Sequence, residues 1–332
     1  MVKSTSGSRC FYNRYQLHYN MCYHAPDMLS NPIFKSLMAF AGCRYLQHSS
    51  LIHTLPSGRQ PVWGMTVMNQ EMFLVRGWSQ DERKDSSLRV GCLLDMEVYD
   101  INTLALRRSF KVNGLEWPSD MTSCNKFHCL YITNCGIIYS VVRVDLAGET
   151  TKWPVCDFPE GISVTSPDDC NVIVTCPKTR KLKQFTSDGQ IVGEIILQDD
   201  VINPIHAIKI NEHYVVCHGW WSDPISRVCL VDSDGRVVHA YGGPRQHAEG
   251  LNFLRLVVDG EGNVLVADCS NERILLLSPR MNEIKELVSK DNDGRSPMPM
   301  RICLDESRGL LYVTDGGSRS TIDILVFKVL DI

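Results

Sequence analysis

The stretch from Leu254 to Pro279 constrains the fold of this 332-residue chain more than any other segment, because it is typical of three short β-strands separated by turns. Its apolar residues alternate with period two, as in half-buried strands. The first two strands are separated by Asp259-Gly260-Glu261-Gly262-Asn263, whose glycines supply the positive φ of a tight hairpin. A three-strand meander cannot bury both faces, so we expect this unit to be repeated along the chain.

A repeat of this kind runs from residue 48 to residue 332. Each copy begins with a proline, one variable residue and a side chain that opens an apolar strand. The copies are Pro61-Val62-Trp63, Pro118-Ser119-Asp120, Pro159-Glu160-Gly161, Pro204-Ile205-His206, Phe253-Leu254-Arg255, in which Phe replaces Pro, and Pro299-Met300-Arg301. They are spaced by 57, 41, 45, 49 and 46 residues. This spacing indicates a four-stranded blade with connections of varying length.

The last copy ends after its third strand, and the segment from Leu51 to Pro61 supplies a pattern for the missing fourth strand. A ring of blades closes when an N-terminal strand joins the last blade, which removes an open sheet edge. We therefore predict an all-β fold, a six-bladed β-propeller over residues 48–332 with an N-terminal strand closing the last blade. Two packed β-sandwiches are the alternative, and they would require six regular copies and a borrowed strand by coincidence.

Residues 1–47 differ from the repeats, since they are rich in Tyr, His and Cys and show no clear period. We expect an N-terminal extension that is partly disordered or contains a short helix at residues 32–46, with Asn31 as N-cap and Pro32 at the first helical position. The spacing of Cys10 and Cys22 matches no usual zinc site.

The copy from Val257 to Pro279, with the sequence VVDGEGNVLVADCSNERILLLSP, resembles the NHL-repeat family of six-bladed propellers. Residues 303–318, CLDESRGLLYVTDGGS, are a second good copy, and the other four are diverged. In tripartite-motif members of that family, the C-terminal propeller is the substrate-recognition end of a ubiquitin ligase. This chain has no RING or B-box spacing, so the resemblance implies a ligase role only with a RING-bearing partner. The motif specifies fold better than chemistry.

The composition favours a soluble protein without a strong overall field. The formal net charge of −4 argues against coating nucleic acid by bulk electrostatics, although a local basic patch remains open. The most apolar N-terminal run, residues 33–43, is short and contains Lys35, so we expect no membrane span. The fourteen cysteines form no CxxC pair and no cleavable signal pattern opens the chain. We therefore expect a reduced, cytoplasmic protein.

Propeller geometry predicts which face binds a ligand. Successive strands of a blade are antiparallel, so the connection into each first strand and the loop from second to third strand share one face. We expect Trp63, Asp120, Gly161, His206, Arg255 and Arg301 to converge at the channel mouth on that face, with Trp78, Arg180, Lys181, His218, Trp220, Trp221 and Arg319 in the loops around it. Trp and Arg are enriched in binding hot spots, and the three loop tryptophans are the best contact candidates.

Several of these residues also have a structural interpretation. Asp268 and Asp315, at strand ends, are expected to bond nearby backbone N–H groups, and Arg273 to form an ion pair between blades. His206 and His218 form a possible metal pair, but channel histidines are more often hydrogen-bonded core residues.

Catalysis is disfavoured by what the mouth offers. Propeller lactonases and paraoxonases hold calcium through a ring of Glu, Asn and Asp oxygens, whereas here Asp120 is opposed by Arg255 and Arg301. A zinc lyase resembling peptidyl-hydroxyglycine lyases needs more channel histidines than two. No GxSxG, HExxH or phosphate-loop motif occurs. A propeller hydrolase or lyase is therefore the least favoured alternative, and we expect no catalytic residue, metal or cofactor.

Two binding functions remain. The first is a monomeric propeller that binds a protein through its loop face. The second is single-stranded RNA binding on the same face, for which the basic segment Pro177 to Lys183 (PKTRKLK) and the tryptophans supply phosphate and stacking contacts. We favour the protein partner.

Overall fold

The computed structural model describes residues 45–56, 60–78, 93–155, 157–166, 168–219, 226–242, 253–282, 284–288, 297–316 and 322–330. Arg44–Ile332 form one compact unit, and only this unit is described below. Every regular element in the described residues is a β-strand, and the strands form six four-stranded antiparallel sheets. The predicted all-β, six-bladed propeller is confirmed.

The blades follow one another in chain order. Blade 1 contains β2 (Val62–Met68), β3 (Glu71–Trp78), β4 (Leu93–Asp100) and β5 (Leu106–Lys111), and blade 2 contains β6 (Pro118–Cys124), β7 (Cys129–Asn134), β8 (Ser140–Asp145) and β9 (Thr150–Pro154). Blade 3 contains β10 (Ile162–Val164), β11 (Val172–Cys176), β12 (Lys181–Phe185) and β13 (Ile191–Ile196), and blade 4 contains β14 (Pro204–Ile210), β15 (His213–His218), β16 (Arg227–Val231) and β17 (Val237–Gly242). Blade 5 contains β18 (Phe253–Val258), β19 (Val264–Asp268), β20 (Arg273–Leu277) and β21 (Ile284–Val288), and blade 6 contains β22 (Pro299–Asp305), β23 (Leu310–Asp315), β24 (Asp323–Leu330) and β1 (Tyr45–Pro56).

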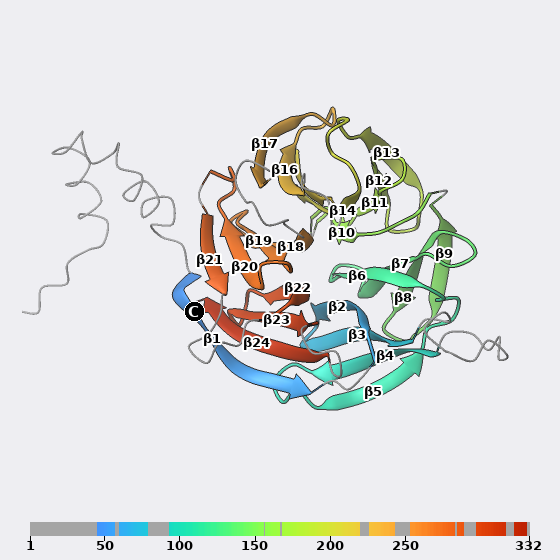
Figure 1. Cartoon of the computed structure of the whole chain (residues 1–332). Helices are drawn as coiled ribbons and strands as arrows, with labels where there is room; N and C mark the ends of the chain where they lie inside the picture. The colour runs from blue at the N-terminus through green and yellow to red at the C-terminus, as the bar shows by residue number, and fades with distance from the viewer. Residues whose placement is uncertain are drawn as a thin grey trace, which may run out of the picture. The chain divides into compact units, whose positions relative to one another are not determined.

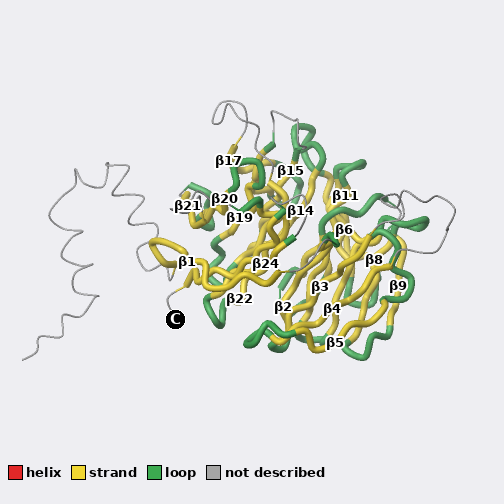
Figure 2. The backbone as a smooth tube through the Cα atoms, turned by 60° about the horizontal axis from the view of Figure 1, so that its bottom comes forward, coloured by secondary structure: helices red, strands yellow, loops and turns green. Residues whose placement is uncertain are grey.

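In each of the first five blades the four strands lie in sequence order from the centre to the rim. The innermost strands β2, β6, β10, β14, β18 and β22 surround the axis (Figure 1), and neighbouring innermost strands contact one another. The tilted view in Figure 2 shows β2 to β5 side by side within one blade. This arrangement places the starts of all six innermost strands at one end of a central channel.

The sixth blade is completed from the other end of the chain. β1 pairs antiparallel with β24, with Leu51 opposite Phe327 and Leu55 opposite Ile324, so the predicted closing strand is confirmed. β1 begins at Tyr45, three residues before the predicted boundary. The predicted helix at residues 32–46 lies outside the described residues except for its last two, which belong to this strand. Closure leaves the propeller without the open edge that an incomplete blade would expose.

The core lies between the blades, where the second strands are buried on both faces. All five residues of β11 and all five of β19 are buried, as is typical of strands enclosed by sheets on either side. In one representative cluster, Phe73 and Val75 of blade 1 pack with Leu130 and Ile132 of blade 2. Burial of such side chains contributes roughly 1.5–3 kcal/mol each, so packing of neighbouring blades stabilises the ring.

A β-bulge follows the start of five of the six innermost strands. The pairing with the second strand shifts between Pro204 and His206, between Phe253 and Arg255, and at matching places in β2, β6 and β22. Proline fits the first position because it has no N–H to contribute to the ladder. A bulge redirects the side chain that follows it, and in β14, β18 and β22 the residue after the bulge lines the channel cavity, as His206, Arg255 and Arg301 respectively.

Candidate functional site

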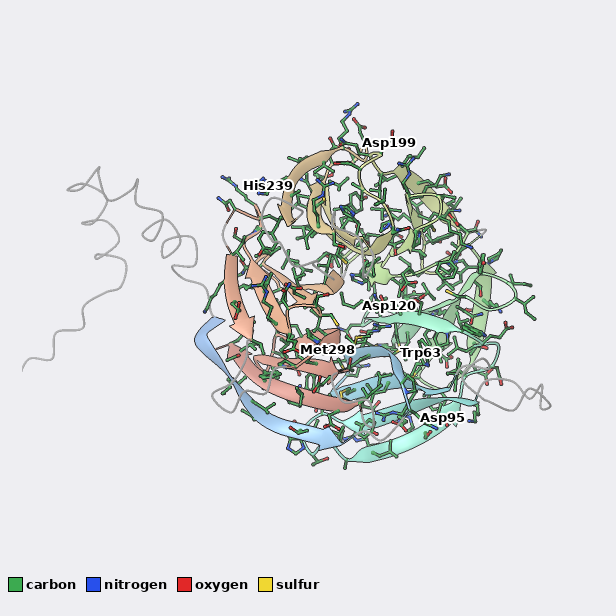
Figure 3. All side chains as sticks on the ribbon, viewed as in Figure 1. Trp63, Asp95, Asp120, Asp199, His239 and Met298 are labelled. Atoms are coloured by element: carbon green, nitrogen blue, oxygen red, sulfur yellow. The ribbon has the colours of Figure 1, made fainter. Side chains whose placement is uncertain are left out.

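The face on which the innermost strands begin and the second strands end is called the mouth face below. A cavity of about 240 Å³ in the channel is lined by residues of all six innermost strands. Asp120, His206, Arg255 and Arg301 all line it, so the structure brings together four of the residues predicted for the mouth. Figure 3 shows Asp120 close to the axis.

The prediction for Trp63 requires a correction. Gly64, not Trp63, pairs with Val75, and this position matches that of His206, which pairs with Cys217. The bulge in β2 comes one residue later relative to the proline than the bulge in β14 does, so the second residue after Pro61 does not take the channel position. The half-buried Trp63 ring packs on the core between blades 1 and 2, and its Nε1 donates a hydrogen bond to the Gly77 carbonyl at 2.9 Å. Its side chain therefore has a structural role.

Asp120 is the carboxylate at the centre of the cluster. Its Oδ1 lies 3.1 Å from Arg255 Nε, and its Oδ2 lies 3.4 Å from His206 Nε2. The same Oδ2 accepts a hydrogen bond from the backbone N–H of Ile162 at 3.1 Å. Asp120 is only 4% exposed. A single buried carboxylate from blade 2 thus contacts blades 3, 4 and 5.

Arg301 extends this network to the remaining blades. Its guanidinium donates hydrogen bonds to the carbonyls of Trp63 at 2.9 Å, Ser119 at 3.0 Å and Met300 at 3.0 Å. Arg255 Nη2 donates to the same Ser119 carbonyl at 2.9 Å. Every blade therefore contributes at least one group to a polar network across the channel.

The pKa values follow from burial and from these neighbours. Burial on its own raises the pKa of Asp120, but the positive charges of Arg255 and Arg301 outweigh it and hold the pKa below its usual range. Burial lowers the pKa of His206 to about 4, so the imidazole is neutral at neutral pH. Burial, reinforced by the neighbouring Arg255, lowers the pKa of Arg301 to about 10, and the side chain remains charged.

Glycine is required at Gly161, the blade 3 member of the ring. A Cβ there would fall on the Ile205 carbonyl oxygen and 2.8 Å from the Cα of His206. The absence of a side chain allows blades 3 and 4 to approach each other and allows His206 Nε2 to reach the Ile162 carbonyl at 3.2 Å.

Residues at the ends of the second strands hold the connections that lead into the innermost strands. Asn134 Oδ1 accepts hydrogen bonds from the backbone N–H groups of Glu116 and Trp117, both at 2.9 Å. Asp315 Oδ1 accepts from the backbone N–H of Met298 at 2.9 Å, as expected for this residue. His218 is fully buried, and its Nδ1 lies 3.1 Å from the Ile202 carbonyl. His218 therefore positions a connection in blade 4.

Two expectations for blade 5 differ from the structure. Asp268 is predicted to bond backbone N–H groups, but in the structure it accepts hydrogen bonds from the side chains of Asn271 and Arg273. Arg273 pairs with Asp268 at 2.9 Å and with Glu286 at 3.3 Å, both within its own blade, so the predicted ion pair between blades is wrong. The antiparallel register places Asp268 directly opposite Arg273, which explains the pairing.

The basic segment of blade 3 is largely compensated by acidic neighbours. Arg180 pairs with Asp199 at 2.7 Å, and Lys181 pairs with Glu194 at 2.7 Å. Figure 3 shows Asp199 at the outer margin of the molecule, away from Asp120. Neither Arg180 nor Lys181 lines the channel cavity.

Four predicted contact residues are not described at the side-chain level. Trp78 is the last residue of β3, but its side chain is not among those described. Trp220, Trp221 and Arg319 lie wholly outside the described residues.

The structure reveals two exposed residues on the mouth face that the sequence interpretation missed. Ile137 is 95% exposed and Ile138 is 60% exposed, in the loop between β7 and β8. All the other large apolar side chains that the structure describes as exposed lie on outermost strands or toward the opposite face. The sequence does contain a signal for them: the two isoleucines lie between two predicted strands, in a loop that propeller geometry assigns to the mouth face.

This loop is held by specific contacts. Ile137 N–H donates to Glu116 Oε2 at 2.7 Å, and the backbone N–H of Cys135 donates to the Trp117 carbonyl at 2.7 Å. Cys135 Sγ lies 2.9 Å from the Pro159 carbonyl of blade 3. The isoleucines are thus presented from an anchored backbone.

Aromatic residues extend this surface toward blade 3. Tyr139 and Phe158 pack edge to face with ring centroids 5.6 Å apart. The Lys178 ammonium lies 5.7 Å and 5.2 Å from the two ring centroids. Ile137, Ile138, Tyr139, Phe158 and Lys178 are called the blade 2–3 patch below.

The chemistry at the mouth does not match an activated nucleophile. His206 is paired in register with Cys217, but burial raises the pKa of that thiol to about 12 while it lowers the pKa of His206. A Cys–His dyad requires the opposite shifts, toward thiolate and imidazolium. In the part of the chain that the structure describes, no group of three or more His, Cys, Asp or Glu side chains is placed to hold a metal ion. No helix in the described residues is long and apolar enough to cross a membrane.

Comparison with solved structures supports the propeller architecture. The β-propeller domain of Cps50 (Swd1) from Myceliophteria thermophila aligns with a TM-score of 0.54 at 12% identity, covering 85% of this chain and 99% of that one. A streptogramin B lyase aligns with a TM-score of 0.53 at 11% identity, covering 84% and 98%. A chain of a nidogen/laminin complex aligns with a TM-score of 0.52 at 11% identity, covering 69% and 80%.

These likenesses show the fold alone. No family model matches the chain, and no curated protein sequence matches it. The resemblance to NHL repeats therefore stays a prediction.

Proposed function

We propose that this protein is a non-catalytic propeller that binds a protein partner through the blade 2–3 patch of its mouth face. The observation that carries the proposal is the pair Ile137 and Ile138, exposed at 95% and 60% on a hydrogen-bonded loop. Apolar side chains on a fixed backbone lose little conformational entropy on binding and gain from desolvation. Their position beside an aromatic pair is typical of an interface centre.

The patch favours a partner segment of defined chemistry. Ile137 and Ile138 suit an apolar side chain, and the exposed Lys178 suits a carboxylate next to it. We therefore propose a partner that presents an apolar residue adjacent to an acidic one. A role as the substrate-recognition subunit of a ubiquitin ligase is a narrower form of this proposal, and it requires a RING-bearing partner chain.

The non-catalytic part of the proposal is supported by the mouth chemistry. The polar groups of Asp120, Arg255 and Arg301 contact other groups of the channel wall, and the thiol of Cys217 is protonated. The solved neighbours include a lyase as well as a protein from a nidogen/laminin complex, so they favour neither activity nor binding. We keep the expectation of a monomeric cytoplasmic propeller as part of the proposal.

A pull-down with matched variants tests the protein interface. The Ile137→Ser/Ile138→Ser double variant is expected to lose partners that the native chain retains. The control Ile191→Ser/Val192→Ser changes two residues that are 60% and 51% exposed on the outer strand β13. Lys178→Glu should weaken the same partners. Partners retained by the Ile137/Ile138 variant but lost by the rim control would contradict the proposed location.

Single-stranded RNA is the second candidate, because Lys178 and two aromatic rings lie together on the mouth face. The pairing of Arg180 and Lys181 with carboxylates favours the protein partner. Salt dependence separates the two: retention of single-stranded RNA that is lost steeply as salt rises would support the RNA candidate. Absence of retention at low salt would remove it.

A further inference from the structure

Arg301 differs from the other charged residues of the mouth cluster. Asp120, His206 and Arg255 are each at most 5% exposed, whereas Arg301 is only partly buried and lines the channel cavity. Its three hydrogen bonds go to backbone carbonyls, which satisfy N–H groups without neutralising the charge. A guanidinium has five N–H donors, so two remain. No carboxylate among the described residues lies within 4 Å of Arg301.

Arg255 does not offset that charge but adds to it. Both Nη2 atoms donate to the Ser119 carbonyl oxygen, at 2.9 and 3.0 Å, so the two guanidinium groups are close neighbours. Asp120 lies 3.1 Å from Arg255, and Glu160 lies 3.8 Å from it at the more exposed edge. Since His206 is neutral, the two guanidinium groups face the carboxylates of Asp120 and Glu160, and both of these carboxylates pair with Arg255 rather than with Arg301.

The cavity below Arg301 limits the size and nature of a ligand. Its volume of about 240 Å³ lies below the roughly 300–1,000 Å³ of pockets for drug-sized ligands. The residues that line it include Thr122 and Ser163, which carry hydroxyl groups, and apolar residues such as Ile208 and Val257. Ser163 Oγ donates to the Ala207 carbonyl at 2.7 Å and so can still accept a hydrogen bond.

We propose that the channel is a binding site for a small molecule with one carboxylate or phosphate group and at least one hydroxyl group, with the oxyanion on Arg301. The two remaining N–H donors of Arg301, which forms no ion pair of its own with a described carboxylate, suit an oxyanion, because charge-assisted hydrogen bonds to guanidinium are the strong ones. The hydroxyl groups of Thr122 and Ser163 suit the polar remainder of the ligand. This site is distinct from the blade 2–3 patch, and it does not depend on the proposed protein interface.

Titration calorimetry of the full chain with glycerate, glycerol 3-phosphate and inorganic phosphate tests the site, with sodium chloride at matched ionic strength and glycerol as references. We expect saturable binding of at least one of the three anions and no binding of glycerol. Arg301→Met should weaken that binding at least tenfold. The control Arg236→Met, which removes an arginine that is 72% exposed and paired with Asp234, should bind like the native chain.

A second variant covers the possibility that Arg301→Met does not fold. Thr122→Leu fills the channel and leaves the charged network in place, and it should abolish anion binding while the thermal midpoint of the apo protein stays near that of the native chain. The proposal is overturned if none of the anions binds saturably, if Thr122→Leu binds as the native chain does, or if Arg236→Met weakens binding equally. The proposal would also be overturned if the native chain binds no small anion and Arg301→Met loses a protein partner. The oxyanion on Arg301 would then belong to that partner.

Discussion

Asp120 shows at the scale of one residue how the mouth chemistry and the fold are linked. Its carboxylate neutralises a guanidinium that is 4% exposed and also orders the start of β10 through Ile162. Removing one partner of a buried ion pair is far more costly than replacing both, because the remaining charge is left without compensation.

Asp120→Ala is therefore expected to lower the free energy of unfolding by roughly 3–5 kcal/mol, the range for a buried pair that loses one partner. Equilibrium unfolding in urea measures this change. Asp234→Ala removes the acid of an exposed pair with Arg236 and should leave the midpoint almost unchanged. Equal effects of the two substitutions would show that the cluster does not hold the blades together.

His206 gives the channel a pH dependence. Its pKa is about 4 in the folded protein and 6.5 in the unfolded chain, so between these values only the unfolded chain binds the proton. The contribution of the buried neutral imidazole to stability is fully present above pH 6.5. As pH falls toward 4 the free energy of unfolding decreases, by up to about 3 kcal/mol for a pKa shift of this size. Asp120, whose pKa is lowered, stays charged across this window and faces the imidazole together with Arg255 and Arg301.

Unfolding curves at pH 7.0 and pH 4.5 test this expectation. The native chain should lose more stability between these values than His206→Gln does. An identical loss in both proteins would contradict the neutral, buried imidazole.

The loop from β7 to β8 is the element on which the proposed function depends. Gly136 packs so closely on Glu116 that a Cβ would meet the Glu116 Cβ at 2.7 Å, and Glu116 also accepts from the Ile137 N–H. The side chain of Glu116 is thus a support for the exposed isoleucines.

Glu116→Ala should increase hydrogen–deuterium exchange in residues 135–139, because the Ile137 amide loses its acceptor. Exchange in β7, which is buried throughout, should stay as slow as in the native chain. Lys126→Ala, on the opposite face of the same blade, is the control. Unchanged exchange at residues 135–139 would show that the loop is held by other contacts.

The strands of all six blades could be predicted, because apolar alternation and turn residues are local signals. The position of Trp63 could not, since the bulge in β2 shifts the register by one residue relative to the proline motif. Likewise, the compensation of Arg180 by Asp199 depends on a neighbour that only the folded chain brings close. The exposure of Ile137 depends on what covers the loop, and this is a tertiary property that periodicity does not report.

At the scale of the whole molecule, two devices close the ring. One is the polar network at the axis, to which every blade contributes. The other is β1 at the rim, which pairs with β24 and reaches blade 5 through a hydrogen bond from Ser49 Oγ to the Leu287 carbonyl at 2.6 Å. The network and β1 together hold the six blades in one ring, which sets the geometry of the mouth face.

The most direct test of this account compares two truncations by thermal unfolding and size-exclusion chromatography. Deletion of residues 1–43 leaves β1 intact, and we expect one cooperative transition within a few degrees of the native midpoint and a monomeric elution volume. Deletion of residues 1–56 removes β1 and exposes the edge of β24, and we expect unfolding or aggregation at ambient temperature. If the shorter chain unfolds at the same temperature as the longer one and remains monomeric, closure by the N-terminal strand is contradicted.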